Sequence, residues 1–190
     1  MTTTLRQSAL VAAVLFCGAA ALSLPMRAHA QPAEMPASTR LAMPGDKHRW
    51  LEPLLGKWNV QMRVWPAAGA APIESDQLTA VREWILGGRY LREELTGAFA
   101  GNPSHRIALL GYNNLEGRFE LVTVDTFEPG QMWYASHADG KPGLISLAGD
   151  NTEAGFGAKP TGRKRSLRFD IEIAGDVNVH SQLSTDGYVG

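Results

Sequence analysis

Apolar and polar residues alternate along most of the chain from Trp58 onward. In the segment 58–64, Trp58, Val60 and Met62 alternate with polar residues, which is the period of a strand with one buried and one solvated face. Eight more segments have extended patterns, at 77–86, 89–99, 105–112, 118–127, 131–137, 144–148, 164–174 and 177–184. Turns rich in glycine, proline, asparagine and aspartate separate these segments, so the pattern predicts nine strands.

A short helix is predicted before the first strand. Asp46 is a typical N-cap residue, and apolar residues follow it at helical spacing as far as Leu55. Gly56 ends the helix, and Pro53 limits it to about one or two turns. We expect its apolar side to face the core, with Trp50, Leu51, Leu54 and Leu55.

The order of the strands predicts the architecture. Successive short strands joined by tight turns form antiparallel meanders, because parallel strands need crossover connections of about a dozen residues or more. A long meander with one apolar face per strand splits into a sandwich or closes into a barrel. We favour closure, because it removes the two sheet edges. The predicted fold is therefore all-β, an antiparallel up-and-down β-barrel of about 8–10 strands with a short N-terminal helix.

The first thirty residues have the three parts of a secretory signal peptide. Arg6 precedes an apolar run at 9–24, and Ala28 and Ala30 are small residues at the positions that a signal peptidase reads. This pattern predicts a signal peptide at 1–30, cleavage after Ala30, and a periplasmic or secreted protein. We further expect a flexible leader at 31–44 and one barrel domain at 45–190.

Two other interpretations of the same segment are membrane anchors. A transmembrane helix needs about 20 continuous apolar residues, and Pro25 and Arg27 interrupt this run. A lipoprotein would be lipidated at Cys17, where Phe16 occupies a position that favours a small residue. We therefore expect no membrane span after cleavage.

Composition narrows the functional classes. The chain has 18 basic and 19 acidic residues, and this balance argues against a nucleic-acid partner, which needs a basic surface. With 44% hydrophobic and 19% charged residues, the chain is too apolar for a disordered protein. Cleavage after Ala30 would remove Cys17, the only cysteine. The mature protein would then have no disulfide, thiolate nucleophile or cysteine metal ligand.

Three motifs carry a resemblance to a known family. They are LGKW at 55–58, LGGRYL at 86–91 and LGYN at 110–113. Together they resemble the bacterial DUF1579 family of calycin-like barrels, and Gly-Lys-Trp is similar to the Gly-x-Trp signature that opens the first strand of lipocalins. The resemblance covers about Asp46 to Ser184. It implies an up-and-down barrel with one closed end, and it brings no established reaction or ligand.

The same resemblance raises a question about the last strand. Chains of the family usually continue through a final strand rich in aromatic and basic residues, whereas this sequence stops at Gly190. The resemblance therefore implies either an open barrel seam or a sequence that is cut short.

Catalytic and metal-binding signatures are absent from the sequence. It contains no Gly-x-Ser-x-Gly, no His-Glu-x-x-His, no phosphate-binding loop and no calcium-binding repeat. Alternation places His105 with Leu109, and His137 with Trp133, on faces that we expect to point inward. Each histidine is then either hydrogen-bonded at the barrel rim or a ligand to haem or a metal.

Two carboxylates also alternate with apolar residues. Asp125 shares a face with Leu121, and Glu83 lies between apolar positions two residues away on either side. A carboxylate on an apolar face is costly unless it is paired or hydrated, and Arg89 and Arg165 are candidate partners. The pairs would either fix the strand register or act as polar anchors in a ligand cavity.

We therefore predict a binding protein that holds a small apolar or amphipathic ligand inside the barrel. The alternatives are a structural or envelope-interaction module with a solid core, because aromatic residues fill barrels as well as line cavities, and a haem-binding or metal-binding barrel. An enzyme is the weakest alternative, because no pair of nucleophile and base can be named. The predicted ligand-binding residues are Trp58, Glu83, Trp84, His105, Leu109, Leu121, Asp125, Trp133, His137 and Phe169.

Overall fold

The computed structural model describes residues 35–64, 71–137, 141–152, 162–174 and 178–188. The predicted signal peptide and the first residues of the predicted leader lie outside these ranges. Three short helical segments precede the sheet: α1 (Ala37–Leu41), α2 (Asp46–Arg49) and the 3₁₀ segment η1 (Glu52–Leu54). Among the described residues, no helix has both the length and the apolar character needed to cross a membrane.

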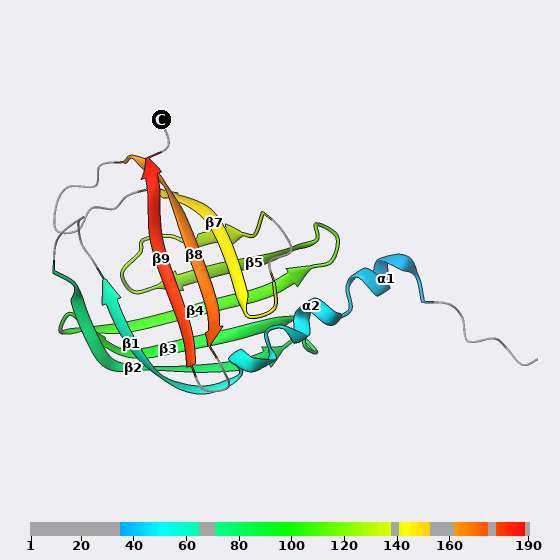
Figure 1. The fold of residues 1–190 in the computed structure, drawn as a ribbon, viewed down its shortest axis with the longest axis horizontal. Coiled ribbons are helices and arrows are strands. Elements are labelled where there is room, and N and C mark those ends of the chain that lie inside the picture. The colour runs from blue at the N-terminus through cyan, green and yellow to red at the C-terminus, as the bar shows by residue number, and fades with distance from the viewer. Residues whose placement is uncertain (1–34, 65–70, 138–140, 153–161, 175–177, 189–190) are drawn as a thin grey trace, which may run out of the picture. The chain divides into compact units, whose positions relative to one another are not determined.

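Nine strands form one antiparallel sheet in which each strand pairs with its neighbours in sequence (Figure 1). Every predicted strand overlaps one of them, so the prediction of an all-β up-and-down fold is confirmed. The strands are β1 (Gly56–Val64), β2 (Ile73–Ile85), β3 (Tyr90–Phe99), β4 (Asn102–Asn113), β5 (Arg118–Asp125), β6 (Met132–Ala135), β7 (Leu144–Thr152), β8 (Lys164–Ala174) and β9 (Asn178–Tyr188).

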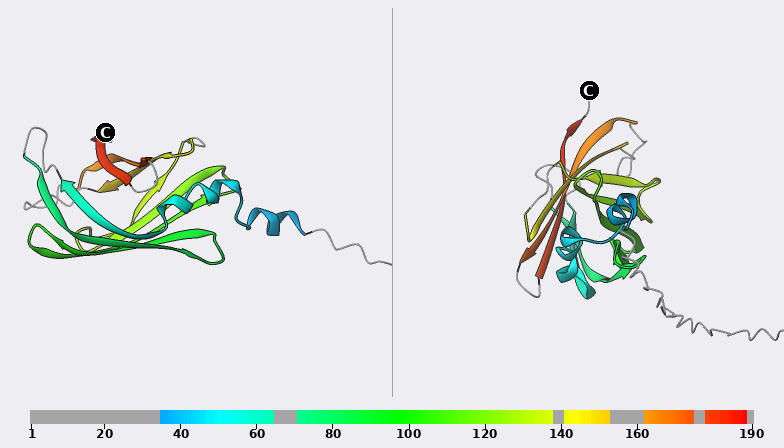
Figure 2. Two further views of the ribbon diagram at one scale, coloured as in Figure 1. Left: turned by 60° about the horizontal axis from the view of Figure 1, so that its bottom comes forward. Right: turned by 90° about the vertical axis from the view of Figure 1, so that its right-hand side faces the viewer.

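The sheet curls into a half-barrel. Figure 2 shows β2–β4 on one side of the interior and β8–β9 on the other. Strands β1 and β9 are the two ends of the strand order, and within the described ranges no backbone pairing joins them. Both edge pairs, β1–β2 and β8–β9, contain a register shift. Because such bulges bend a strand and disrupt its ladder, they protect an edge that strand pairing leaves open.

The core fills the concave side of the curled sheet. Trp58, Val60 and Met62 of β1 are partly buried against Leu78 and Leu95, which confirms the face predicted for β1. The larger part of the core combines η1 with strands β3 to β8. Its buried members are Leu51, Leu54, Leu91, Ala108, Leu110, Phe119, Leu121, Tyr134, Ile145, Leu147, Leu167 and Ile171.

The segment 45–55 packs its apolar side into this core, as predicted. Leu51 and Leu54 are buried, and the Trp58 indole Nε1 donates a hydrogen bond of 2.9 Å to the Leu54 carbonyl. The predicted single helix is divided into α2 and η1. Its N-cap is Gly45 rather than Asp46, and the Gly45 N–H donates to His48 Nδ1 at 3.0 Å. Asp46 stands instead in the first turn, where its charge suits the helix dipole.

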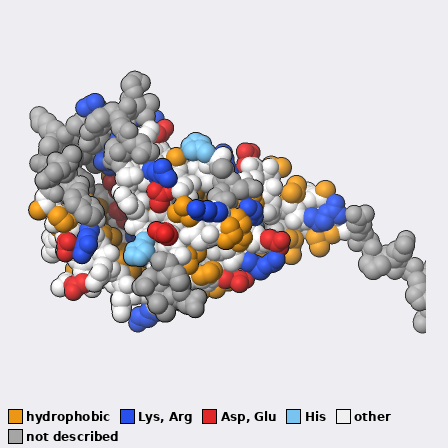
Figure 3. All heavy atoms as spheres, in the orientation of Figure 1, with side chains coloured by type: hydrophobic (Ala, Val, Ile, Leu, Met, Phe, Trp, Pro, Cys, Tyr) orange, Lys and Arg blue, Asp and Glu red, His pale blue; other side chains and the backbone are white. Residues whose placement is uncertain are grey.

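The described part of the predicted flexible leader, residues 35–44, contains a helix and contacts the sheet. Residues 37–41 form α1, and the turns of the sheet hold the backbone that follows. Arg89 Nε donates to the Ala42 carbonyl at 2.6 Å, and Asn114 Nδ2 donates to the carbonyls of Leu41 and Met43 at 2.8 and 2.9 Å. Composition alone does not reveal such long-range contacts. Figure 3 shows hydrophobic and basic side chains exposed around α1.

Removing the side chain of Leu51 tests the role of the N-terminal segment in the core. Leu51 is 0% exposed, so Leu51→Ala is expected to lower the free energy of unfolding by about 2–5 kcal/mol. Leu115→Ala is the matched control, because Leu115 is 77% exposed and its truncation should change stability by less than about 0.5 kcal/mol. Equal effects of both variants in urea unfolding would contradict this packing.

Candidate functional site

Three charged side chains meet on the concave face of the sheet. Arg82 lies on β2, Glu93 on β3 and Arg106 on β4. Glu93 is directly opposite Arg82 in the β2–β3 register. Arg106 pairs with Leu95, two residues beyond Glu93, so Arg106 is a diagonal neighbour of the carboxylate. The strand register therefore brings these three residues together.

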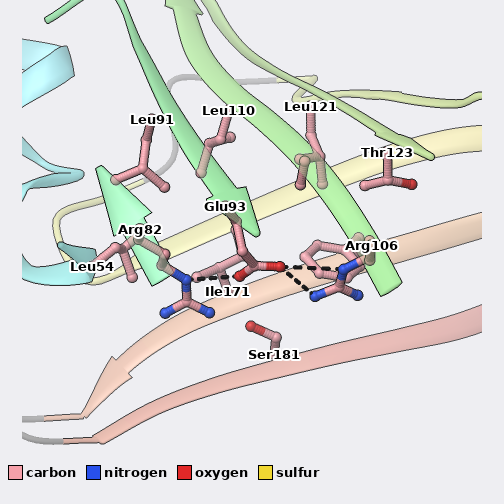
Figure 4. A pocket seen from close by; sticks show the side chains of 12 residues that line it. Leu54, Arg82, Leu91, Glu93, Arg106, Leu110, Leu121, Thr123, Ile171 and Ser181 are labelled. Atoms are coloured by element: carbon pink, nitrogen blue, oxygen red, sulfur yellow. Dashed lines mark hydrogen bonds and ion pairs between the residues drawn. The ribbon is translucent and has the colours of Figure 1, made fainter. Parts of the chain in front are cut away.

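The carboxylate of Glu93 bridges the two guanidinium groups (Figure 4). Arg82 Nε donates to Glu93 Oε2 at 2.7 Å. Arg106 donates to Glu93 Oε1 from Nη2 at 2.6 Å and from Nε at 3.2 Å. The side chains of Arg82 and Glu93 are only 11% and 9% exposed, and that of Arg106 is 23% exposed. Because the ion pairs are shielded from water, their charges interact more strongly than those of exposed surface pairs.

The electrostatic balance of this cluster keeps Glu93 ionised. Burial raises the pKa of Glu93, but the charges and hydrogen bonds of Arg106 and Arg82 together outweigh burial and hold the pKa below its ordinary value. Guanidinium groups stay protonated in proteins. The cluster therefore combines two positive charges with one negative charge.

A cavity of about 40 Å³ adjoins the cluster. Since one buried water needs at least about 10–15 Å³ of such space, the cavity has room for roughly three waters or a group of similar size. Within the described ranges, two buried polar side-chain atoms have no hydrogen-bond partner, Arg82 Nη1 and Thr123 Oγ1. The lining is formed by Leu54, Arg82, Leu91, Glu93, Arg106, Ala108, Leu110, Leu121, Thr123, Phe169, Ile171 and Ser181.

The cavity wall has an apolar side and a polar side. Seven of the lining residues are aliphatic or aromatic, and they come from η1, β3, β4, β5 and β8. The polar part is the ion cluster together with Thr123 and Ser181. Figure 4 shows the Ser181 hydroxyl directed toward the cluster. Because Ser181 is exposed, the cavity reaches solvent beside β9.

Other buried titratable groups belong to the framework around the cavity. His48 is buried and contacts the Tyr112 ring edge to face at 6.1 Å; burial, followed by the charge of Arg89, lowers the pKa of His48. Burial raises the pKa of Tyr134 to about 12, and its hydroxyl donates to Met132 Sδ at 3.3 Å. Both groups therefore stay neutral at neutral pH.

Four of the ten predicted ligand-binding residues face the core. Trp58 and Trp84 pack against it, and Leu121 and Phe169 also line the cavity. Asp125 stands at the end of the inward face of β5, where its Oδ1 accepts hydrogen bonds of 2.8 Å from the backbone N–H groups of Phe127 and Glu128. Asp125 therefore caps the turn after β5.

The other five predicted residues do not point inward, so this expectation is wrong. Glu83, His105, Leu109 and Trp133 lie on the convex face, and His137 is exposed beyond the end of β6. Glu83 Oε1 accepts a hydrogen bond from Arg92 at 3.1 Å, His105 Nε2 lies 3.2 Å from Glu94 Oε1, and Trp133 is 60% exposed.

The physical reason for this error is that apolar residues occupy both faces of β2 and β4. Val81 and Leu109 made the convex face resemble a core face, whereas the buried faces carry Ala80 and Leu110. The two histidines considered as haem or metal ligands, His105 and His137, therefore do not reach the cavity. The described ranges contain no group of three or more His, Cys, Asp or Glu residues arranged for a metal ion.

Sequence reasoning missed the ion cluster, although its signal was present. Glu93 alternates with Leu91 and Leu95, Arg82 follows Ala80 by two residues, and Arg106 precedes Ala108 by two residues. Each charge stands at an apolar position of its strand. Comparing both faces of each strand for isolated charges would have found all three.

The fold and the cavity define a class of protein, an up-and-down antiparallel curled sheet with a small interior cavity that has a charged and an apolar side. The chain belongs to the family described as protein of unknown function, DUF1579, whose model matches residues 43–184. This confirms the family to which the sequence motifs pointed. No curated protein matches the chain.

Glu93→Gln tests whether the carboxylate holds the two arginines together. The variant leaves two buried guanidinium groups without their counterion, so the free energy of unfolding is expected to fall by about 3–5 kcal/mol. Glu83→Gln is the matched control. It removes a carboxylate of an exposed pair with Arg92, and such pairs contribute little to stability. Equal stability of the Glu93→Gln variant and the unmodified protein in urea unfolding would contradict the role of the cluster.

The stabilisation by Glu93 also depends on pH. Because the pKa of Glu93 is lowered in the folded state, the unfolded chain binds a proton first as the pH falls below about 4.3. The stability difference between the unmodified protein and Glu93→Gln should therefore be largest above this pH and shrink as the pH falls toward the folded pKa. A difference that grows on acidification would contradict the lowered pKa.

Proposed function

We propose that this protein binds a small amphipathic ligand inside the curled sheet. One observation carries the proposal: a cavity that joins a buried ion cluster to an apolar wall and contains polar atoms without a protein partner. Ligand sites are typically apolar with a few placed polar groups that fix the orientation of the ligand. The polar end of the ligand is placed at the cluster and its apolar end against the wall.

The polar end is supported by Arg82 and Thr123. An unpaired polar atom that is shielded from water costs free energy, and a ligand that pairs with it recovers part of this cost. Arg82 Nη1 and Thr123 Oγ1 are such atoms in the described part of the chain. They belong to different strands, β2 and β5, so they are separate anchoring points along one wall.

The apolar end is supported by Leu110, Leu121 and Phe169. These side chains line the cavity and belong to or pack against the main core. Phe169 is only partly buried, and it lies on β8, across the interior from β4 and β5. A chain of a few carbons at this position would contact both sides of the half-barrel.

The second candidate function is an interaction module with a solid core. The small cavity volume, about 40 Å³, favours it, as do apolar side chains exposed on the convex face. Val124 and Trp133 are both exposed there, on neighbouring strands β5 and β6. In this case the convex face would contact a partner and the interior would serve stability alone.

Export belongs to the same proposal. It is supported by the order of Arg6, the apolar run at 9–24 and the small residues Ala28 and Ala30. An exported binding protein would meet its ligand outside the cytoplasm. The polar cluster and the core depend only on residues beyond the predicted cleavage point.

Two six-carbon probes test ligand binding. Hexan-1-ol and hexanoate are titrated separately into the ¹⁵N-labelled protein, and the backbone amides of Leu110 and Leu121 are expected to shift saturably with at least one probe. Phe169→Ala should weaken this binding by about 1–3 kcal/mol, because the ring is part of the apolar wall that the carbon chain contacts. Trp133→Ala is the matched control and should bind as the unmodified protein does. If neither the unmodified protein nor Phe169→Ala shows a saturable shift, ligand binding is contradicted and the interaction module with a solid core remains.

The export proposal predicts the N-terminus of the processed protein. Mass spectrometry of the protein from the periplasmic or extracellular fraction of a producing bacterium should show a chain that begins at Gln31. Ala28→Arg should block cleavage, because a signal peptidase requires a small residue at this position. A full-length chain in the cytoplasm of cells that make the unmodified protein would contradict export.

A further inference from the structure

We infer that the ligand group held at the ion cluster is an anion, of the carboxylate class, and that Arg82 is the residue that selects it. This inference rests on the proposed binding function and names the chemistry of its polar end. Three independent features of the cavity support it: the charge balance of its wall, the unpaired donor on Arg82, and the size of the space.

The charge balance favours a monoanion. Two guanidinium groups and one carboxylate leave one positive charge on the cavity wall, and Glu93 is the only acidic residue among those that line it. A buried charge without a counterion is unfavourable, and an anion close to it regains much of that cost. A neutral polar group would supply hydrogen bonds but no countercharge.

The unpaired donor locates the anion at the Arg82 end of the cluster. The Nε of Arg82 is used by Glu93, whereas its Nη1 is buried without a partner in the described part of the chain. The Arg82 guanidinium also lies over the Trp58 ring, with its Cζ 5.5 Å from the ring centre. Guanidinium donors match the oxygens of a carboxylate in geometry and charge.

The Arg106 end is less suited to an anion. Arg106 uses two of its donors on the same oxygen of Glu93. Arg82 uses only Nε on Glu93, and its buried Nη1 has no partner in the described part of the chain. The donor that is available to an anion therefore lies on the side of Arg82.

The remaining groups around the cluster are compatible with a carboxylate. The Ser181 hydroxyl is directed toward the cluster from β9 (Figure 4), and a hydroxyl is able to donate to a carboxylate oxygen. A space of about 40 Å³ has the size of about three waters, so it accommodates a carboxylate head, and a longer carbon chain extends from it toward the opening beside Ser181. Such a carboxylate belongs either to a free short acid or to the head of a longer amphiphile.

The test compares a charged and a neutral probe of the same length. By isothermal titration calorimetry, hexanoate is expected to bind the unmodified protein at least tenfold more tightly than hexan-1-ol. Arg82→Gln should abolish this preference. The variant leaves Glu93 and Arg106 as a balanced pair, so it is expected to fold. Arg92→Gln, which removes an arginine of the convex face, is the matched control and should keep the preference.

A measurement on the unmodified protein covers the case in which Arg82→Gln fails to fold. The side-chain ¹⁵N resonances of Arg82 should shift on addition of hexanoate and stay in place on addition of hexan-1-ol. If hexan-1-ol binds as tightly as hexanoate, the anion inference is wrong and the proposed binding function stands. If neither probe binds, the proposed function itself fails.

Shorter straight-chain acids, down to acetate, distinguish the sources of the carboxylate. Acetate that competes with hexanoate at similar concentration would identify the site as one for a free short acid. An affinity that rises several-fold per added methylene from acetate to hexanoate would identify the head of an amphiphile, because the tail then gains contact with Leu121 and Phe169. Both results support the anion site. Failure of both acetate and hexanoate to bind would overturn it.

Discussion

The burial of Glu93 between Arg82 and Arg106 is the interaction on which the interior of this protein depends. Three charged groups occupy positions where their strands otherwise present leucine and alanine to the core. Taking charges out of water costs several kcal/mol for each ion unless partners compensate, and here one carboxylate serves two guanidinium groups. A slip of β3 by one residue would turn Glu93 to the convex face and leave both arginines without a counterion. The cluster therefore ties the register of β2, β3 and β4 to the charge balance of the cavity.

The curled sheet and the N-terminal segment provide the surroundings that make this cluster effective. Leu51 and Leu54 close one part of the interior, and the Trp58 indole connects the end of η1 to β1 through its hydrogen bond to the Leu54 carbonyl. Arg89, in the LGGRYL motif, holds the carbonyl of Ala42 and lies beside buried His48. Low polarity around the cluster strengthens both its ion pairs and its attraction for an anion.

The sequence predicted the strands well because turns rich in glycine, proline, asparagine and aspartate separate the extended segments. It predicted the packing of Leu51 and Leu54 because these residues recur at helical spacing. It predicted the wrong face for Glu83, His105 and Leu109, because apolar residues occupy both faces of β2 and β4 and a single strand does not show which face is inside. Strand pairing resolves this ambiguity, since Arg82 is placed opposite Glu93 and only one face can be common to β2, β3 and β4. Export was read from a segment that lies outside the described residues and stays a prediction.

The most direct measurement is the titration of the Glu93 carboxyl group by ¹³C NMR, with its resonance assigned by comparison with the Glu93→Gln spectrum. If two arginines compensate the burial of this group, its midpoint will lie below that of an ordinary glutamate, which is about 4.3. A midpoint at or above the ordinary value would contradict the account, because the effect of burial on the pKa would then outweigh that of the arginines. The carboxyl group would accept a proton readily, and the cavity wall would not carry the charge that the anion site requires.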